Sequence, residues 1–398
     1  MRSFEEMRNL GLAVLRPSAR DLEYGLELHK RLTVFDAYGF IPLGGCKLTE
    51  RLKTLVEQNA SRDEIFWELE KMCMGDAFDN QQIVSRFKEA VELSGVNCLF
   101  QNSGVEGNNG MEMLKRLGLY NKLADRFPGM LERAPFPDRM DKIQAAGKLA
   151  LYPTTNGVPL PEHITSTQEA LNWIEVFFNL GVRMMHFTYN RRNLLGDGCA
   201  EIADAGISEF GQQAIEEMNR VGMICDLAHS GQQTTITAAK FSKKPVVVSH
   251  AVAYELSGHY RGKCDEAIEA VKQSGGYVGI CAHPPFLGGS KMIDALLDHI
   301  DYVAKKFGVD HVAIGTDHST RLDSDDEINC PPYRPILEQY WRKNDGSFDM
   351  TQEQYDSMAW VNWPLFTVGL VQRGYKDDEI AKIVGGNVMR VCQEVLAV

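Results

Sequence analysis

The sequence predicts an α/β fold, a (β/α)8 TIM barrel with extra helices at its N- and C-terminal ends. Two observations lead to this prediction: short apolar runs recur along the chain, and helical periodicity lies between most of them. The eight runs lie near residues 33–38, 96–101, 149–154, 181–188, 222–228, 245–249, 276–282 and 311–316. A doubly wound open sheet is the alternative, but it would normally carry a glycine-rich phosphate loop after its first strand. Residues 36–40 read Asp-Ala-Tyr-Gly-Phe, which is not such a loop.

Two of the intervening helices have clear boundaries in the sequence. Ser208 is a good N-cap for a helix that carries apolar residues at helical spacing and ends at Gly222. A second helix is predicted from about Met292 to Phe307, with its apolar residues on one face.

The whole chain, residues 1–398, is predicted to form a single barrel domain. We expect a helical extension at about 1–32, a helical insertion at about 103–141 and a long loop after the last strand at about 319–350. Loops of this length after barrel strands are often lids or substrate walls.

Composition excludes several classes of protein. The chain has 398 residues, of which 44% are hydrophobic, so it can bury a large core. Its formal net charge of −12 argues against nucleic acid and favours a small-molecule partner. The nine cysteines never fall in a Cys-x-x-Cys spacing, so we expect reduced thiols in a cytoplasmic protein. No apolar run resembles a signal peptide or a transmembrane helix, and we expect no membrane partner.

The best functional clue is a pair of histidines, His229 and His250, each of which ends an apolar strand-like run. Ligands of barrels bind just past the carboxyl ends of the strands, so two such residues predict one shared site. The other predicted strand ends carry Tyr38, Glu106, Asn156, Tyr189, His283, Asp317 and His318. A carboxylate with several imidazoles can bind a divalent transition metal or share acid and base work without metal. Four other histidines, His29, His163, His186 and His299, are assigned to structure or solvent.

Several motifs resemble the renal or membrane dipeptidase family of metallopeptidases. They include Gly206-Ile207-Ser208-Glu209-Phe210-Gly211, the run from Met218 to Ser230 around His229, and Lys244-Pro245-Val246-Val247-Val248-Ser249-His250, followed by Arg261, Gly315-Thr316-Asp317 and Gly385-Gly386-Asn387. The similarity extends in order from about residue 145 onward. It implies a barrel with two zinc ions bridged by a glutamate, and a metal-activated water that attacks the amide of a small dipeptide.

Only part of the family's machinery carries over to this chain. By the resemblance, His229 and His250 match two metal ligands, Asp317 the catalytic acid or base, and Arg261 the residue that grips the substrate carboxylate. Where the family has the other ligands, this chain has Tyr38 and Phe40 in place of a His-x-Asp pair, and Asn156 in place of the bridging glutamate. Tyr189 replaces a histidine that stabilises the reaction intermediate.

These replacements argue against a dinuclear zinc centre, because the first site keeps no anionic ligand. We expect at most one Zn2+, with Asp317, His283, His318 or Glu106 as the possible third ligand beside His229 and His250; a pocket with no metal is the alternative. The sequence thus predicts a homodimeric hydrolase of a small dipeptide or amide that bears a carboxylate. A metal-free isomerase or lyase and a non-catalytic binding protein on the same barrel remain the other hypotheses.

Overall fold

A computed structural model describes residues 2–45, 48–104, 106–134, 136–323 and 340–396. Within these ranges the strands are β1 (Phe35–Gly39), β2 (Cys98–Asn102), β3 (Leu131–Arg133), β4 (Leu149–Thr155), β5 (Met184–His186), β6 (Ile224–Asp226), β7 (Val248–Ala251), β8 (Val278–Ile280) and β9 (Val312–Ile314). The eight predicted strands correspond to β1, β2 and β4 to β9. The additional strand, β3, has three residues and pairs with β4 beside the barrel.

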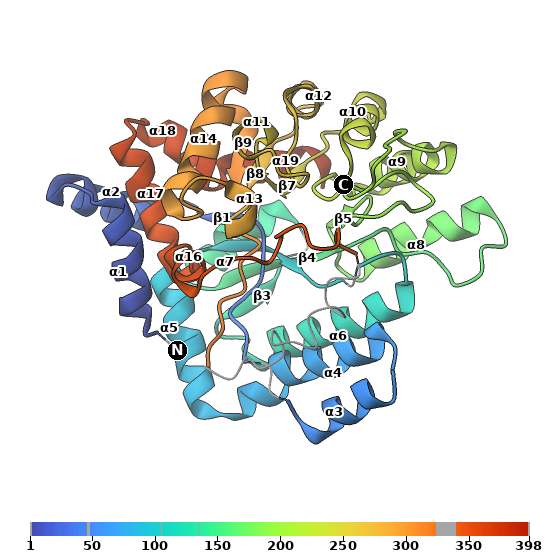
Figure 1. The fold of residues 1–398 in the computed structure, drawn as a ribbon, viewed down its shortest axis with the longest axis horizontal. Helices are drawn as coiled ribbons and strands as arrows, with labels where there is room; N and C mark the ends of the chain where they lie inside the picture. Colours follow the sequence, from blue (N-terminus) through green and yellow to red (C-terminus); the bar gives the residue numbers. More distant parts are fainter. Residues whose placement is uncertain (1, 46–47, 105, 135, 324–339, 397–398) are drawn as a thin grey trace.

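The strands form a curled, parallel barrel, as predicted (Figure 1). One sheet has the order β1-β2-β4-β5-β6, and a second has the order β7-β8-β9. Few backbone contacts join the two sheets: one bridge pairs Asp226 with Val247, and the N–H of Asp317 donates to the carbonyl of Tyr38 over 2.9 Å. The two junctions between these sheets, called the seams of the barrel below, therefore have few backbone hydrogen bonds between strands.

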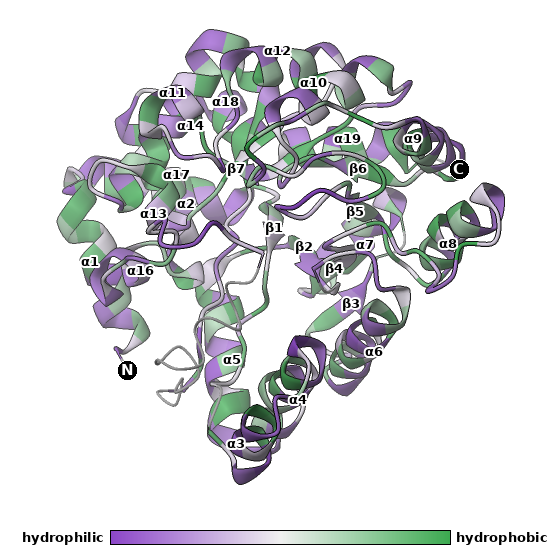
Figure 2. Cartoon of the chain, turned by 45° about the vertical axis from the view of Figure 1, so that its right-hand side comes forward, coloured by the Kyte–Doolittle hydropathy of each residue, from purple (hydrophilic) through white to green (hydrophobic). Residues whose placement is uncertain are grey.

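Helices surround the barrel. They are α1 (Phe4–Leu15), α2 (Ala19–Arg31), α3 (Glu50–Glu57), α4 (Arg62–Met74), α5 (Gln81–Ser94), α6 (Gly110–Arg126), α7 (Met140–Ala145), α8 (Thr167–Asn179), α9 (Glu209–Val221), α10 (Gln232–Phe241), α11 (Tyr254–Ser257), α12 (Asp265–Gln273), α13 (Pro284–Leu287), α14 (Ile293–Phe307), α16 (Gln352–Ser357), α17 (Trp363–Gln372), α18 (Asp377–Ala381) and α19 (Asn387–Val395). Helix α12 turns hydrophilic residues outward and buries Ile268 and Val271 (Figure 2). Among the described residues, none of the helices combines the length and the apolar character needed to cross a membrane.

The two helices with clear sequence boundaries are confirmed. Ser208 caps α9, its hydroxyl accepting from the N–H of Gly211, and Gly222 ends the helix in the left-handed conformation. Helix α14 begins at Ile293 and ends at Phe307.

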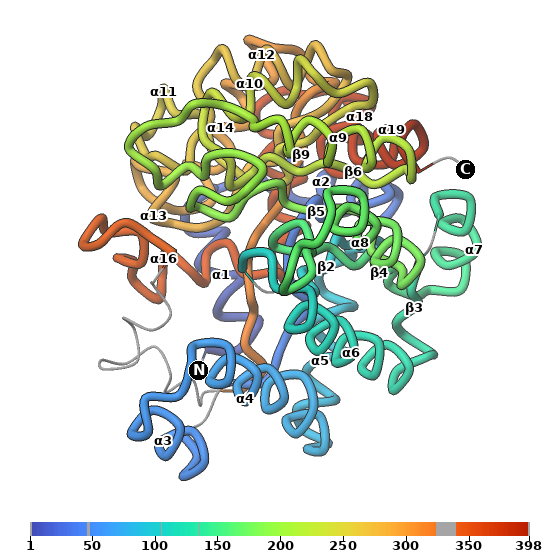
Figure 3. Tube along the Cα trace, turned by 90° about the vertical axis from the view of Figure 1, so that its right-hand side faces the viewer, coloured from blue at the N-terminus to red at the C-terminus, as the bar shows by residue number. Residues whose placement is uncertain are grey.

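The predicted extension and insertions lie outside the barrel strands. Helices α1 and α2 pack against α17, whereas α3, α4, α5 and α6 gather at one end of the molecule, away from α10 and α12 (Figure 3). The segment predicted as a helical insertion, 103–141, contains α6 but also β3. Of the predicted loop 319–350, residues 324–339 lie outside the described part of the chain.

Two glycines allow strands β7 to β9 to pack closely near the site. A Cβ on Gly279 would lie 1.9 Å from the carbonyl oxygen of Ser249, and a Cβ on Gly315 would lie 2.0 Å from the same atom. No side chain fits at either position without moving the backbone that carries His250.

We therefore expect Gly279→Ala to destabilise the protein by about 1–3 kcal/mol or more, because overpacking against backbone forces a strand to shift. Gly118→Ala is the matched control: Gly118 is an exposed residue of α6 whose added Cβ would have nothing within 4 Å. The control should be neutral or stabilising by about 0.5–1 kcal/mol. Urea unfolding of both variants measures this difference, and equal stabilities would contradict the close approach.

Candidate active site

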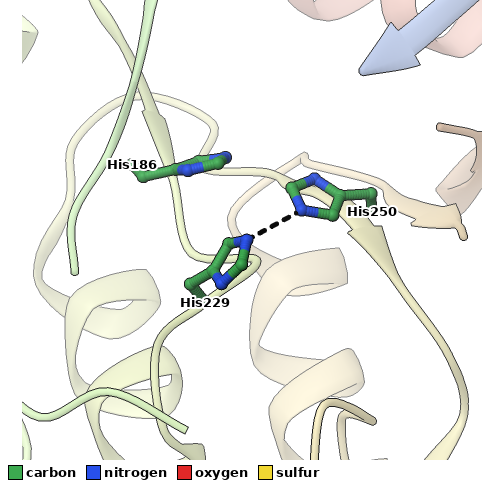
Figure 4. A group of neighbouring side chains, drawn as sticks. All are labelled: His186, His229 and His250. Carbon is green, nitrogen blue, oxygen red and sulfur yellow. Dashed lines mark hydrogen bonds between the residues drawn. The ribbon is translucent and has the colours of Figure 1, made fainter. Parts of the chain in front are cut away.

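Three buried histidines converge at the carboxyl ends of neighbouring strands. His186 ends β5, His229 follows β6 and His250 lies in β7. One ring nitrogen from each lies within 4.8 Å of the others, and the Nε2 atoms of His229 and His250 are 3.0 Å apart (Figure 4). In the described part of the chain, this is the group of side chains that has the composition and spacing of a metal site.

Hydrogen bonds to the other ring nitrogens orient two of these imidazoles. Nδ1 of His229 lies 2.7 Å from Oδ1 of Asn190, and Nδ1 of His250 lies 2.8 Å from Oγ of Ser249. The Ser249 hydroxyl donates to the carboxylate of Asp226, so its oxygen accepts from His250. With both Nδ1 atoms acting as donors, both neutral rings direct an Nε2 lone pair toward the same point. This is the arrangement of metal-ligating histidines that have partners in the outer shell.

The environment keeps the rings uncharged. Burial, and after it the positive charge of Arg261, lowers the pKa of His229 and of His250 well below the ordinary value. Nδ1 of His186 is also buried and has no hydrogen-bond partner among the described residues. Two neutral imidazoles with available lone pairs, beside a third ring whose Nδ1 has no partner among the described residues, are suited to bind a cation.

Asp226 connects two of the three histidines. Its Oδ2 lies 2.7 Å from Nε2 of His186, at an angle outside that of a regular hydrogen bond, and its Oδ1 accepts from the N–H groups of Ala228 and Ser249. Burial raises the pKa of Asp226, but the contacts with His186 and Ser249 outweigh burial, and the pKa is lowered overall. Asp226 is therefore an ionised carboxylate that holds the cluster in place.

Two tyrosines cover the histidines. The ring of Tyr38 stacks on His250 with centroids 3.9 Å apart, and the ring of Tyr189 stacks on His229 at 4.0 Å. The Tyr38 hydroxyl donates to Oδ1 of Asn156 over 2.7 Å. Burial raises the pKa of both tyrosines well above the ordinary value, so both phenols keep their protons. Tyr38 and Asn156 thus form a neutral pair at the positions where the resemblance places charged metal ligands.

Asp317 is the carboxylate whose properties suit proton transfer. It directly follows the last strand region with a φ of 50°, a left-handed conformation that is uncommon for a residue other than glycine and often found at functional sites. Burial raises its pKa to about 7, against the opposing effect of Arg261. A carboxylate that titrates near neutral pH can both accept and return a proton.

Arg261 lies behind the histidines. Its guanidinium donates to the carbonyls of Ala228 and His250, and Nη2 lies 3.5 Å from Nε2 of His229. It is fully buried, and its Nε has no partner among the described residues. The structure thus places this positive charge beside the cluster, in contact with backbone carbonyls.

A cavity of about 800 Å3 opens onto the cluster. Tyr38, Asn156, Tyr189, His229 and Asp317 all line it. The predicted catalytic and substrate-binding residues therefore share one space, except that Arg261 lies beneath its wall.

The other candidates for a third ligand are engaged elsewhere. Nε2 of His283 donates to the carbonyl of Ser347 over 2.8 Å, and Nε2 of His318 lies 3.1 Å from the carbonyl of Tyr355. Glu106 forms an ion pair with Arg62 over 2.6 Å. All three side chains line the cavity, but none belongs to the histidine cluster.

The residue that completes the cluster is His186, which the sequence analysis assigned to structure or solvent. The predicted strand ran to residue 188 and placed His186 in its middle, whereas β5 ends at His186 and brings it into the cluster. The alternation of side chains along a strand could have indicated this position. His186 lies two residues after Met184, so both side chains point to the same face of β5. The structural roles of His29 and His299 agree with the prediction, since both bond to buried groups outside the site.

Comparisons with known proteins agree on one family. Residues 69–330 match the sequence model described as membrane dipeptidase, peptidase family M19. Dipeptidase tcpJ of Claviceps purpurea is 25% identical over 86% of this chain and 68% of its own length. An uncharacterized dipeptidase of Schizosaccharomyces pombe is 30% identical over 59% of this chain and 57% of its own length.

Solved structures share the fold over nearly the whole chain. An amidohydrolase from Pseudomonas aeruginosa superposes with a TM-score of 0.69 at 25% identity, covering 93% of this chain and 98% of its own. The probable dipeptidase PvdM from the same organism has a TM-score of 0.67 at 20% identity, covering 95% and 98%. At that identity the second likeness shows the fold alone.

The two strand-end aspartates should affect stability in opposite ways. The raised pKa of Asp317 means that, between pH 3.8 and about 7, the unfolded chain releases a proton that the folded chain keeps, so stability falls as pH rises. Asp317→Asn should therefore be more stable than wild type at pH 8, by up to about 4 kcal/mol at about 1.4 kcal/mol per pKa unit.

Asp226→Asn is the matched comparison. The lowered pKa of Asp226 contributes stability above pH 3.8 that is lost as the pH falls further, so this variant should be less stable than wild type at pH 8. The difference in unfolding free energy between Asp226→Asn and wild type should become smaller as the pH falls below 3.8. Denaturant unfolding against pH measures both curves; parallel curves for the two variants would contradict the assigned charges.

Proposed function

The chain belongs to the membrane dipeptidase family, peptidase family M19, and from this premise we propose that it hydrolyses a small dipeptide-like amide bearing a carboxylate. We propose further that it works with at most one metal ion, held by His186, His229 and His250. The single observation that supports this best is the convergence of three buried imidazoles, one of which, His229, lines the cavity.

The donor set suits one zinc ion. Zinc bonds to imidazole nitrogen at about 2.0–2.1 Å in a tetrahedron, which separates two ligand nitrogens by roughly 3.3 Å. The 3.0 Å separation of the His229 and His250 nitrogens is close to that spacing. When bound, the metal would polarise the amide carbonyl and lower the pKa of a water molecule. A second ion has no comparable set, because Tyr38, Phe40 and Asn156 stand where the family's other ligands are expected.

In this proposal Asp317 moves the proton. Its carboxylate takes a proton from the water that attacks the amide carbon, and it then gives this proton to the leaving nitrogen as the carbon–nitrogen bond breaks. The products are a carboxylic acid and an amine, so the atoms balance. A pKa of about 7 keeps both the ionised and the protonated forms of Asp317 populated at neutral pH.

The amide oxygen, the backbone and the carboxylate of the substrate would be bound by uncharged hydrogen-bonding side chains and by the buried cation Arg261. The protonated phenol of Tyr189, which lines the cavity beside His229, would donate to the amide oxygen as it gains negative charge. The Tyr38–Asn156 pair would bind the substrate backbone next to it. Arg261 would attract the substrate carboxylate through its field, since two of its nitrogens are already bonded to carbonyls.

A metal-free acid–base reaction on the same barrel is the second candidate, and the position of Arg261 favours it. A guanidinium nitrogen 3.5 Å from Nε2 of His229 would repel a divalent ion bound there. In that reaction Asp317 and a histidine of the cluster would act as the base and the acid.

Metal content distinguishes these candidates. We expect protein from metal-replete cells to contain about one equivalent of zinc, and chelation to abolish dipeptide hydrolysis, because a structural or catalytic zinc site needs three protein ligands. His186→Ala should lose the metal. His283→Ala, a buried cavity histidine outside the cluster, should retain it. Hydrolysis by wild-type protein that elemental analysis shows to be metal-free would reject the metal proposal.

Asp317 sets the expected pH dependence. Because the ionised form is the base, kcat/KM for dipeptide hydrolysis should rise with pH along a limb centred near pH 7. Asp317→Asn should lower kcat/KM by about 10²–10⁴ and remove this limb. Asp323→Asn, which changes another aspartate of the cavity wall, is the control and should keep the limb. An unchanged limb in Asp317→Asn would assign the titration to another group.

A further inference from the structure

One wall of the cavity is built from aromatic rings. Its members, called the aromatic wall below, are His283, Phe286, Trp341 and Phe348, and all four line the cavity. Phe286 stands at the centre: its ring centroid lies 4.4 Å from that of His283 and 5.8 Å from that of Trp341. Phe348 closes the wall, with its ring edge-on to Trp341 at 5.1 Å.

The aromatic wall reaches the histidine cluster. The ring of Trp341 lies 6.5 Å from His229, while Tyr189 covers His229 at 4.0 Å. A group bound next to His229 therefore meets the aromatic wall within one side-chain length. The rings come from α13 and its flank and from the segment 341–348, which belongs to the predicted long loop.

The four rings of the aromatic wall carry no charge, and the nearby guanidinium of Arg261, 5.5 Å from the ring centroid of Phe286, does not line the cavity. His283 donates from Nε2 to the carbonyl of Ser347, and burial lowers its pKa to about 4, so its ring is neutral at pH 7. The three arginines that line other parts of the cavity already have partners: Arg116 pairs with Glu70, Arg2 pairs with Asp356, and Arg321 donates to the carbonyl of Gly44. An apolar, planar group is therefore better matched to the wall than a second anionic group.

The geometry points to a specificity subsite: the aromatic wall binds an aromatic side chain adjacent to the scissile amide, so the preferred substrate is a dipeptide-like amide of an aromatic amino acid. Calling the bound molecule a substrate rests on the proposed hydrolase function, but the binding of an aromatic side chain depends only on the rings. Offset and edge-to-face ring pairs are more favourable than the same buried area of aliphatic carbon, which corresponds to a preference of about two- to tenfold.

Inert probes test the subsite without turnover. The probes are dipeptides of alanine with phenylalanine, in both orders, whose amide is reduced to a secondary amine; their partners carry cyclohexylalanine, which is saturated but similar in size. Titration calorimetry of the full-length protein gives the ratio of the two dissociation constants. We expect the phenylalanine probe of one order to bind about two- to tenfold more tightly than its cyclohexyl partner.

Variants locate the preference. Phe286→Leu and Phe348→Leu should each bring the ratio close to one. Phe87→Leu is the matched control, because Phe87 is fully buried in α5 against Phe78 and Phe127, outside the cavity, and its variant should keep the wild-type ratio. Thermal melting identifies any variant that has lost its fold. If one of the two wall variants is unfolded, the binding ratio of the other tests the inference.

The outcomes separate this inference from the proposed function. Equal binding of the two probes, tighter binding of the cyclohexyl probe, or no measurable binding of either at millimolar concentration would overturn the aromatic subsite, whatever the protein hydrolyses. A wall-dependent preference would support it even if no dipeptide were cleaved, in which case the hydrolase proposal alone would fail.

Discussion

The carboxylate of Asp226 is the group on which the candidate site depends. It ends β6 at a seam of the barrel, where the ladder to the next strand is a single bridge. Its oxygens accept from the backbone and hydroxyl of Ser249 and contact His186, so one side chain ties β5, β6 and β7 together. Through Ser249 it also fixes the ring of His250. A buried charge is costly unless it is paired and hydrogen-bonded, and Asp226 accepts three hydrogen bonds and lies beside the imidazole of His186.

Asp36 also joins neighbouring strands through a buried carboxylate, at the other seam of the barrel. Its carboxylate accepts from the N–H and hydroxyl of Thr316 and from the indole of Trp360, joining β1 to the residues after β9. Burial nevertheless raises the pKa of Asp36 to about 6, whereas the pKa of Asp226 is lowered. The difference lies in the partner: Asp226 faces an imidazole that can carry positive charge, while the partners of Asp36 are neutral. Equivalent geometry at two seams thus produces one ionised carboxylate and one that titrates close to neutral pH.

The sequence predicted the barrel well because buried parallel strands are continuous apolar runs, which stand out against amphipathic helices. It missed β3, which has three residues, and it misplaced His186, because apolar residues continue past the point where the ladder of β5 ends. It also offered His283 and His318 as ligands, since both follow strands. Their actual partners are carbonyls 64 and 37 residues away along the chain, which no local pattern reveals.

The replacements at the family's metal positions are physically coupled. A histidine-to-tyrosine change alone would place a phenol against the bridging carboxylate, and a glutamate-to-asparagine change alone would leave a histidine without its anionic neighbour. In this chain Tyr38 and Asn156 occur together and bond to each other over 2.7 Å, so the loss of charge leaves no buried donor or acceptor of this pair without a partner. Tyr38 and Tyr189 each also cover one of the retained histidines. These contacts leave the two retained histidines packed against uncharged rings at positions where the resemblance places further metal ligands.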